Sequence, residues 1–289
     1  MKRFVKMIVV LVALCLLAGM SAACGPEPVE LQIQKSVDNL AKAESYEMNT
    51  DMSVSMRSLD LLIEVDTAEE TLCFPELMKT KVLTTADVMG SVMVIERYIL
   101  HKDDAVKMYV SDGMDGWNGE ELPIGTMALG QYDAELNLDL FLKSAGSFKK
   151  VGTEEIDGVM TDVLEGSAPN WAMREHMDSL LRMLDMHAMT EDPAYYDAVF
   201  DTFGGMEDMP LKLWIDPETY TPVQYHMDMT KTMNAVMEAL MKTLAAASGA
   251  QGNDMSGFTY TVANFEMTVK LRNLNKAAEF TVPATVLGL

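Results

Sequence analysis

The side chains of this sequence that could bind a soft metal ion are thioethers, thiols and imidazoles. Its 289 residues include 27 methionines, three cysteines and four histidines. Met183, Met186 and His187 share one face of the helix expected there, and such ligands suit a three-coordinate Cu(I) ion. These methionines also occupy positions where an amphipathic helix carries apolar residues. We therefore predict no metal site and keep Cu(I) binding as the weaker alternative.

Motifs that assemble a catalytic centre are missing from the sequence. It contains no GxSxG, HExxH or CxxC motif and no phosphate-binding glycine loop. The four histidines are scattered, and 44 aspartates and glutamates make chance pairs of carboxylates unavoidable. We therefore predict that the protein is not an enzyme and that it needs no cofactor.

Methionine is the compositional anomaly of the sequence, and metal binding is only one of its explanations. Methionine can fill a closed core, or it can line a cavity that repacks around hydrophobic ligands of different shape. Three methionines alternate with polar residues on an expected strand, and four recur at intervals of four residues near an expected helix. Core filling is the simpler explanation, because a closed core would have the same pattern. The candidates for lining a cavity are Met48, Met52, Met56, Trp214, Met229, Met233, Met237 and Met241.

The periodicity of apolar residues predicts the elements that would position these side chains. Apolar residues at every second position indicate strands, and spacings of three to four indicate helices. The expected helices cover 31–44, 132–146, 169–203 and 230–249. The expected strands cover 46–56, 59–65, 106–110, 258–271 and 278–282, with two further hairpins over 148–166 and 211–229.

Both hairpins carry a turn signal. Asp157-Gly158 is a common two-residue hairpin turn, and Pro217 suits the second position of a type I turn. The sequence shows no strand–helix–strand alternation of the kind that builds parallel sheets. We therefore predict a single domain of the α+β class, dominated by antiparallel strands.

The first 23 residues have the order of an export signal. Lys2, Arg3 and Lys6 precede an apolar run over 7–20, and small residues follow that run. The run has about 14 residues, whereas a membrane-spanning helix needs about 20, so a permanent membrane helix is the weaker interpretation. After cleavage, 19 basic residues remain against 44 acidic ones. This charge repels nucleic acid and anionic lipid headgroups, so we expect no nucleic-acid partner.

The sequence Ser21-Ala22-Ala23-Cys24 resembles the lipobox of bacterial lipoproteins. The resemblance implies a diacylglyceryl group on Cys24, cleavage just before it, and a lipid anchor at the extracytoplasmic face of a cell membrane. An ordinary signal peptide with a chance cysteine is the alternative. On the first interpretation the chain divides into a signal peptide (1–23), a tether (24–30) and one folded domain (31–289).

A second resemblance covers most of the mature chain. The initial helix, the long antiparallel strands, the Trp214-Ile215-Asp216-Pro217 hairpin and the closing LRNLNKAAEFTVPATV look like a group of poorly characterised bacterial lipoproteins. That group is related in fold to the LolA and LolB carriers and to the LppX-type lipid-binding lipoproteins. The resemblance implies a curved, incompletely closed antiparallel sheet, or half-barrel, with helices over its concave face.

The same resemblance implies an apolar cavity between sheet and helices. The expected function is non-catalytic binding of a hydrophobic or amphipathic, lipid-like ligand in that cavity. The alternative function is that of a surface-interaction or structural lipoprotein without a ligand. No protein partner can be named from the sequence.

Overall fold

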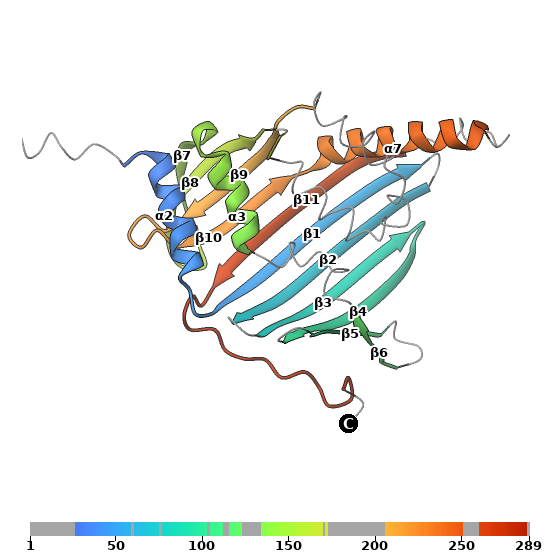
Figure 1. Ribbon diagram of the computed structural model, residues 1–289, viewed down its shortest axis with the longest axis horizontal. Helices are drawn as coiled ribbons and strands as arrows, with labels where there is room; N and C mark the ends of the chain where they lie inside the picture. Colours follow the sequence, from blue (N-terminus) through green and yellow to red (C-terminus); the bar gives the residue numbers. More distant parts are fainter. Residues whose placement is uncertain are drawn as a thin grey trace, which may run out of the picture.

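The computed structural model describes residues 27–58, 61–74, 77–102, 105–111, 116–122, 134–169, 171–172, 206–250 and 260–287. Their strands form one antiparallel sheet with the spatial order β6-β5-β4-β3-β2-β1-β11-β10-β9-β8-β7 (Figure 1). The first flank consists of β1 (Tyr46–Ser58), β2 (Leu61–Phe74), β3 (Leu77–Val88), β4 (Ser91–Lys102), β5 (Ala105–Ser111) and β6 (Asn118–Leu122). The second flank consists of β7 (Lys149–Ile156), β8 (Val159–Ala168), β9 (Met209–Ile215), β10 (Pro222–Asp228) and β11 (Tyr260–Arg272). Each flank therefore comes from one half of the chain.

The two flanks meet where the first strand pairs with the last. β1 runs antiparallel to β11, from Glu47 opposite Arg272 to Ser58 opposite Tyr260. In every other described pair, the two strands are consecutive in the sequence. The sheet is thus two meanders joined along a single long-range seam.

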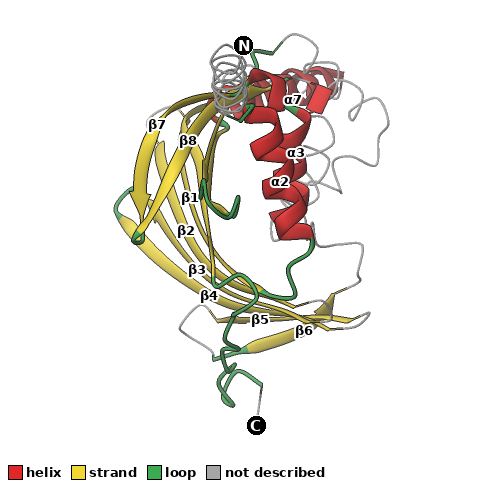
Figure 2. Ribbon diagram, turned by 90° about the vertical axis from the view of Figure 1, so that its left-hand side faces the viewer, coloured by secondary structure: helices red, strands yellow, loops and turns green. Residues whose placement is uncertain are grey.

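The sheet is strongly curved, and the helices lie on its concave side (Figure 2). The described helices are α2 (Val29–Ala41), α3 (Ala134–Lys143), the short 3₁₀ helix η2 (Ala145–Ser147) and α7 (Thr230–Ala250). α2 packs against α3, while α7 follows β10 and lies along β11. This open antiparallel sheet with helices over one face confirms the predicted α+β half-barrel fold.

The buried face of α2 follows from its amphipathic sequence. Ile33 and Leu40 are fully buried, and Val37 packs against the same cluster. These three residues are spaced by three and four positions, which places them on one side of a helix. The helix begins at Val29, directly after Pro28 and inside the range predicted for the tether.

Two-residue turns with positive backbone φ angles join two of the hairpins. Asp157 and Gly158 have φ angles of 49° and 85° between β7 and β8, as their Asp-Gly sequence predicts. Met89 and Gly90 have φ angles of 55° and 82° between β3 and β4. Methionine is an unusual residue at such a turn, so the β3–β4 hairpin has no turn signal in the sequence.

Side chain and backbone together fix the loop between β9 and β10. The Asp216 carboxylate accepts hydrogen bonds from the Glu218 backbone N–H at 2.8 Å and from the Thr219 hydroxyl at 2.7 Å. The Asp216 backbone N–H donates to the Thr221 carbonyl oxygen at 3.0 Å. These bonds close the loop on itself and confirm the hairpin predicted over 211–229.

The strand predicted over 278–282 is wrong. The C-terminal segment (273–287) contains no strand along its described length and packs on the convex face of β4 and β5. There Val282 and Val286 are buried against Tyr98, whose ring centroid lies 5.4 Å from that of Trp117. The alternating apolar residues are therefore buried in a separate cluster on the sheet, and the segment buries them without pairing with another strand.

Candidate functional site: the concave face of the sheet

Side chains alternate along each strand, so the sheet has a concave face toward the helices and a convex face away from them. Strand pairing aligns the concave side chains in rows across the sheet. One row contains Met227, Met267 and Met52 on β10, β11 and β1, as directly opposed pairs. Met227 and Met267 are buried, and Met52 is partly buried. Met48, which is buried, and Met56, which is partly buried, share this face of β1.

The methionines predicted for the helix reach the same core cluster. Met233 is buried and Met237 partly buried against it, and Met241 is half-buried farther along α7. Met229 is also buried, but it precedes the helix, and its backbone N–H donates to the Phe265 carbonyl oxygen at 2.8 Å. Sheet and helix thus contribute methionines to one cluster; their role in binding stays a prediction.

Trp214 lies on the other face of the sheet. Its neighbours Leu213 and Ile215 belong to the concave core, so alternation directs Trp214 to the convex side. Its Nε1–H donates to Glu154 Oε2 at 2.7 Å, and the Lys212 Nζ lies 4.8 Å from its ring centroid. Because the sheet separates Trp214 from the methionines, its prediction as a cavity residue is corrected.

One end of the concave face is a closed core. Phe141 on α3 meets Tyr225 on β10 edge-on, with ring centroids 5.5 Å apart, and Phe148 lies 5.8 Å from Phe141 on the same measure. Ile33 and Leu40 from α2 are fully buried in the same cluster. Burial of side chains of this size contributes about 1.5–3 kcal/mol each. Side chains of α2 and α3 therefore close this end of the described concave face.

On β2 and β3 the concave face buries polar side chains. The hydroxyl oxygens of Thr67 and Thr84 are 3.4 Å apart, and those of Thr71 and Thr80 are 3.2 Å apart. Glu69 lies between these two pairs on β2, and only 9% of its surface is exposed. A carboxyl group in such a place must be neutral or be compensated by charge or hydrogen bonds.

Glu69 carries the largest electrostatic anomaly of this face. Burial raises the pKa of its carboxyl group to about 7, although the positive charge of Arg97 acts in the opposite direction. Arg97 lies in the same row, because Glu69 pairs with Val82 and Val82 pairs with Arg97. Two strand spacings, or about 10 Å, therefore separate their backbones. Near neutral pH this carboxyl group exists in both protonation states, so it can donate or accept a hydrogen bond.

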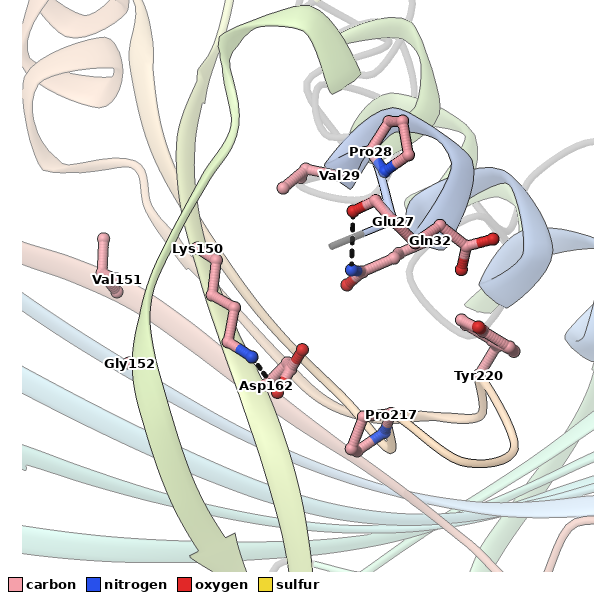
Figure 3. A pocket seen from close by; sticks show the side chains of 10 residues that line it. All are labelled: Glu27, Pro28, Val29, Gln32, Lys150, Val151, Gly152, Asp162, Pro217 and Tyr220. Carbon is pink, nitrogen blue, oxygen red and sulfur yellow. Dashed lines mark hydrogen bonds and ion pairs between the residues drawn. The ribbon is translucent and has the colours of Figure 1, made fainter. Parts of the chain in front are cut away.

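A cleft of about 850 Å³ lies beside the first turn of α2 (Figure 3). On one wall the Lys150 Nζ lies 2.6 Å from Oδ1 of the buried Asp162. The other wall contains Glu27 and Tyr220; Glu27 forms an ion pair with Lys35, whose Nζ lies 4.1 Å from the Tyr220 ring centroid. The hydrogen bond from Lys35, followed by one from Tyr220, lowers the pKa of Glu27. Lys150, which lines the cleft, is paired with Asp162, and Glu27 is paired with Lys35, so the charges along the described walls are matched.

Several predicted positions lie outside the described residues. They are Cys24 and the three residues of the Cu(I) alternative, Met183, Met186 and His187. Of the helix expected over 169–203, only residues 169 and 171–172 are described. Within the described ranges, no group of three or more His, Cys, Asp or Glu side chains could hold a metal ion. None of the described helices is both long and apolar enough to cross a membrane.

Comparisons with known proteins find similarity in structure but none in sequence. No protein-family model and no curated protein matches this chain. Among solved structures, LprF from Mycobacterium bovis is 14% identical, covers 90% of this chain and 98% of its own, and has a TM-score of 0.47. The lipoprotein LppX from Mycobacterium tuberculosis is 14% identical, with coverage of 88% and 99% and a TM-score of 0.42.

A LolA superfamily protein from Nitrosomonas europaea is also similar. It is 11% identical, covers 90% of this chain and 97% of its own, and has a TM-score of 0.23. Identities and scores this low carry no information about a ligand.

Proposed function

We propose that this protein is an exported lipoprotein that binds a hydrophobic or amphipathic ligand on the concave face of its sheet and catalyses no reaction. The observation that carries this proposal is the row of Met227, Met267 and Met52 across three strands. We call this row the methionine strip. Thioether side chains are unbranched and polarizable, so such a strip can repack around acyl chains of different shape.

The position of the methionine strip supports a binding role. In the adjacent row, Tyr225 is fully buried beneath Phe141. Met52 and Met56, by contrast, keep part of their surface accessible. A binding surface needs side chains that are apolar and still reachable, and these two methionines meet both conditions.

The lipid anchor belongs to the same proposal. Residues 1–23 would be the signal peptide, 24–30 the tether and 31–289 the folded body, with acyl chains on Cys24. Only three residues lead from Cys24 to Glu27, so their Cα atoms lie within about 11 Å of each other. The cleft at the start of α2 would therefore face the membrane surface. The acidic body gains nothing from anionic headgroups, so two or more acyl chains must hold it there.

Native mass spectrometry of the full-length Cys24→Ser protein, produced in bacteria, tests ligand binding. We expect a co-purified apolar molecule that is released by organic solvent. The Met52→Trp variant enlarges a side chain on the concave face and should reduce the bound fraction severalfold. The Met89→Trp variant makes the same change at an exposed turn, where 73% of the methionine surface is accessible, and should keep the ligand. A protein without any bound apolar molecule would contradict the proposal.

Metabolic labelling tests the anchor separately. The wild-type protein should incorporate labelled palmitate and sediment with membranes. The Cys24→Ser variant should lose the label. Unlabelled wild-type protein in the membrane fraction would show that another segment provides the attachment.

A second function, contact with a protein partner, is favoured by one observation. The β3–β4 hairpin exposes apolar side chains toward its tip, at the end of the sheet opposite the α2–β1 connection. The exposed residues are Leu83, Val88, Met89, Val92, Met93 and Val94. Clusters of exposed apolar residues often mark interaction sites.

Photo-crosslinking in intact cells tests this second function. A photoreactive residue at Val92, which is 63% exposed, should give one discrete protein adduct if the hairpin contacts a partner. The matched control is Val151, which is 55% exposed and lies on β7 in the other flank. A result in which neither or both positions give adducts would exclude a partner specific to the hairpin.

A further inference from the structure

Two polar side chains that face each other on the concave side are buried without a hydrogen bond among the described residues. Thr50 on β1 lies directly opposite Glu69 on β2. Thr50 is 4% exposed, and its hydroxyl oxygen has no hydrogen-bond partner in the described part of the chain. The Glu69 side chain is 9% exposed, and burial raises the pKa of its carboxyl group against the opposing charge of Arg97. Buried polar groups without partners are rare and destabilising in native proteins.

The neighbouring rows show that this shortage is local. Thr67 and Thr84 satisfy each other on one side of Glu69, and Thr71 and Thr80 do so on the other. On this stretch of β1 and β2 the Thr50 hydroxyl is a buried group without a partner among the described residues, and the carboxyl group of Glu69 faces it. A polar group from outside the protein could satisfy both at once.

We propose that Thr50 and Glu69 form a polar subsite that binds the hydroxyl group of an acyl lipid. This inference rests on the proposed lipid-binding function and names the class of ligand. The ligand hydroxyl donates a hydrogen bond to the Glu69 carboxyl oxygen and accepts one from the Thr50 hydroxyl. Both groups have the capacity for this arrangement.

Strand geometry connects the subsite to the methionine strip. Thr50 and Met52 are two residues apart on β1, so they point to the same face about 7 Å from each other. Met52 pairs with Met267, which pairs with Met227. An acyl chain whose polar end stays at Glu69 can therefore lie against Met52, the thioether of the strip that keeps part of its surface accessible.

The charges on this face favour a neutral polar group over an ionised one. A carboxylate or phosphate would lie against Glu69, which is itself acidic. An ammonium group would share the face with the guanidinium of Arg97, which lies in the same row. A hydroxyl group avoids both conflicts, and its transfer from water to an apolar surrounding costs far less free energy than that of an ionised group.

Equilibrium binding of two radiolabelled probes tests the proposal on full-length Cys24→Ser protein. The probes are 1-monooleoylglycerol and methyl oleate, which share the oleoyl chain and differ in the free hydroxyl groups. We expect about tenfold tighter binding of monooleoylglycerol, as one net hydrogen bond would provide. Thr50→Val keeps the shape of the side chain, and Glu69→Leu removes the carboxyl group. Either substitution should reduce the preference to less than about threefold without weakening the binding of methyl oleate.

Matched controls lie on the convex face next to each residue. Glu70→Leu changes the following residue on β2, and Asp51→Val changes the following residue on β1; both are exposed. These variants should keep the tenfold preference. Equal binding of the two probes by the parent protein, or a preference that survives in Thr50→Val and Glu69→Leu, would overturn the subsite while leaving lipid binding intact. Binding of neither probe would overturn the proposed function and the subsite together.

Discussion

The side-chain amide of Asn234 hydrogen-bonds both backbone groups of Val262. Its Nδ2–H donates to the Val262 carbonyl oxygen at 2.6 Å, and its Oδ1 accepts from the Val262 N–H at 2.8 Å. β10 ends at Asp228, so this stretch of β11 has no further strand pairing on that side. The Thr230 hydroxyl likewise accepts the Phe265 N–H at 2.9 Å. α7 therefore satisfies the open edge of β11 through side chains instead of a strand.

Replacement of Asn234 by alanine should measure this edge contact. Asn234→Ala leaves two backbone groups of β11 unpaired, so we expect the free energy of unfolding to fall by about 1–3 kcal/mol. Urea denaturation of the Cys24→Ser protein gives the value. The control, Glu238→Ala on the exposed side of α7, removes an ion pair with Lys242 and should change stability by about 0.5 kcal/mol or less. Equal effects of the two substitutions would contradict the role of Asn234.

Glu69 should make the stability of the protein depend on pH. Its pKa of about 7 in the folded protein lies above the ordinary value of 4.5. Between these values the folded state binds more protons than the unfolded state, so the free energy of unfolding falls as pH rises from 4.5 to 7. Glu69→Gln removes this loss. The free energy of unfolding of the variant, relative to that of the parent, should therefore increase by about 3 kcal/mol between pH 4.5 and pH 7. Urea denaturation at several pH values measures the difference.

The comparison with Glu70→Gln isolates the effect of burial on Glu69. Glu70 is the next residue on the same strand and is exposed on the convex face. Its substitution removes the same charge from a strongly acidic protein without relieving a buried carboxyl group. We therefore expect parallel pH profiles for Glu70→Gln and the parent. A Glu69→Gln profile that also stays parallel would show that Glu69 has an ordinary pKa.

The cluster beneath the C-terminal segment should unfold locally when its central contact is removed. Val282→Ala takes apolar volume from the cluster of Tyr98 and Trp117, so Trp117 should become more accessible to a collisional quencher. We expect a loss of about 1–3 kcal/mol, since the residue is buried at the surface of the sheet and the segment can relax. The control is Thr281→Ala, at an exposed position beside it. An unchanged quenching constant in Val282→Ala would show that the segment does not cover Trp117.

Methionine substitutions should separate closed packing from an accessible lining. Met267 is 7% exposed, so Met267→Ala should lower the free energy of unfolding by about 2–5 kcal/mol. Met267→Leu conserves volume and should lower it by less than about 1.5 kcal/mol. Met52 is more accessible, so Met52→Ala should cost clearly less than Met267→Ala. Similar losses at both positions, measured by urea denaturation, would indicate that the methionine strip is closed core throughout.

Local signals in the sequence were sufficient for much of the fold. The Asp157-Gly158 turn, the hairpin around Pro217 and the alternation of the central strands are all found where they were predicted. The β3 and β4 strands were not predicted, because Val92 to Ile95 are consecutive apolar residues and Met89 occupies the turn. The strand predicted over 278–282 was wrong for the opposite reason. Its apolar residues alternate as in a strand, but they are buried against a face of the sheet without strand pairing.

The candidate site was harder to predict than the fold. Trp214 belongs to the strongest hairpin signal, yet it is one residue out of phase with the concave side chains Leu213 and Ile215. Glu69 was one of 44 carboxylates and had no motif around it. Its position along the strand was the sequence signal that could have identified it. Glu69 lies an even number of residues after Ile63 and Val65, so its side chain points to the same face as theirs. That Glu69 would be buried depends on long-range packing, which no local pattern contains.

The pairing of β1 with β11 has a consequence for how the protein is made. Synthesis proceeds from the amino terminus, so the meander of β1 to β6 can form while most of the second meander has not yet left the ribosome. Until residues 260–272 emerge, β1 presents a long unpaired edge, of the kind that invites pairing with other chains. A nascent chain therefore passes through a stage at which this edge is open to pairing with other chains.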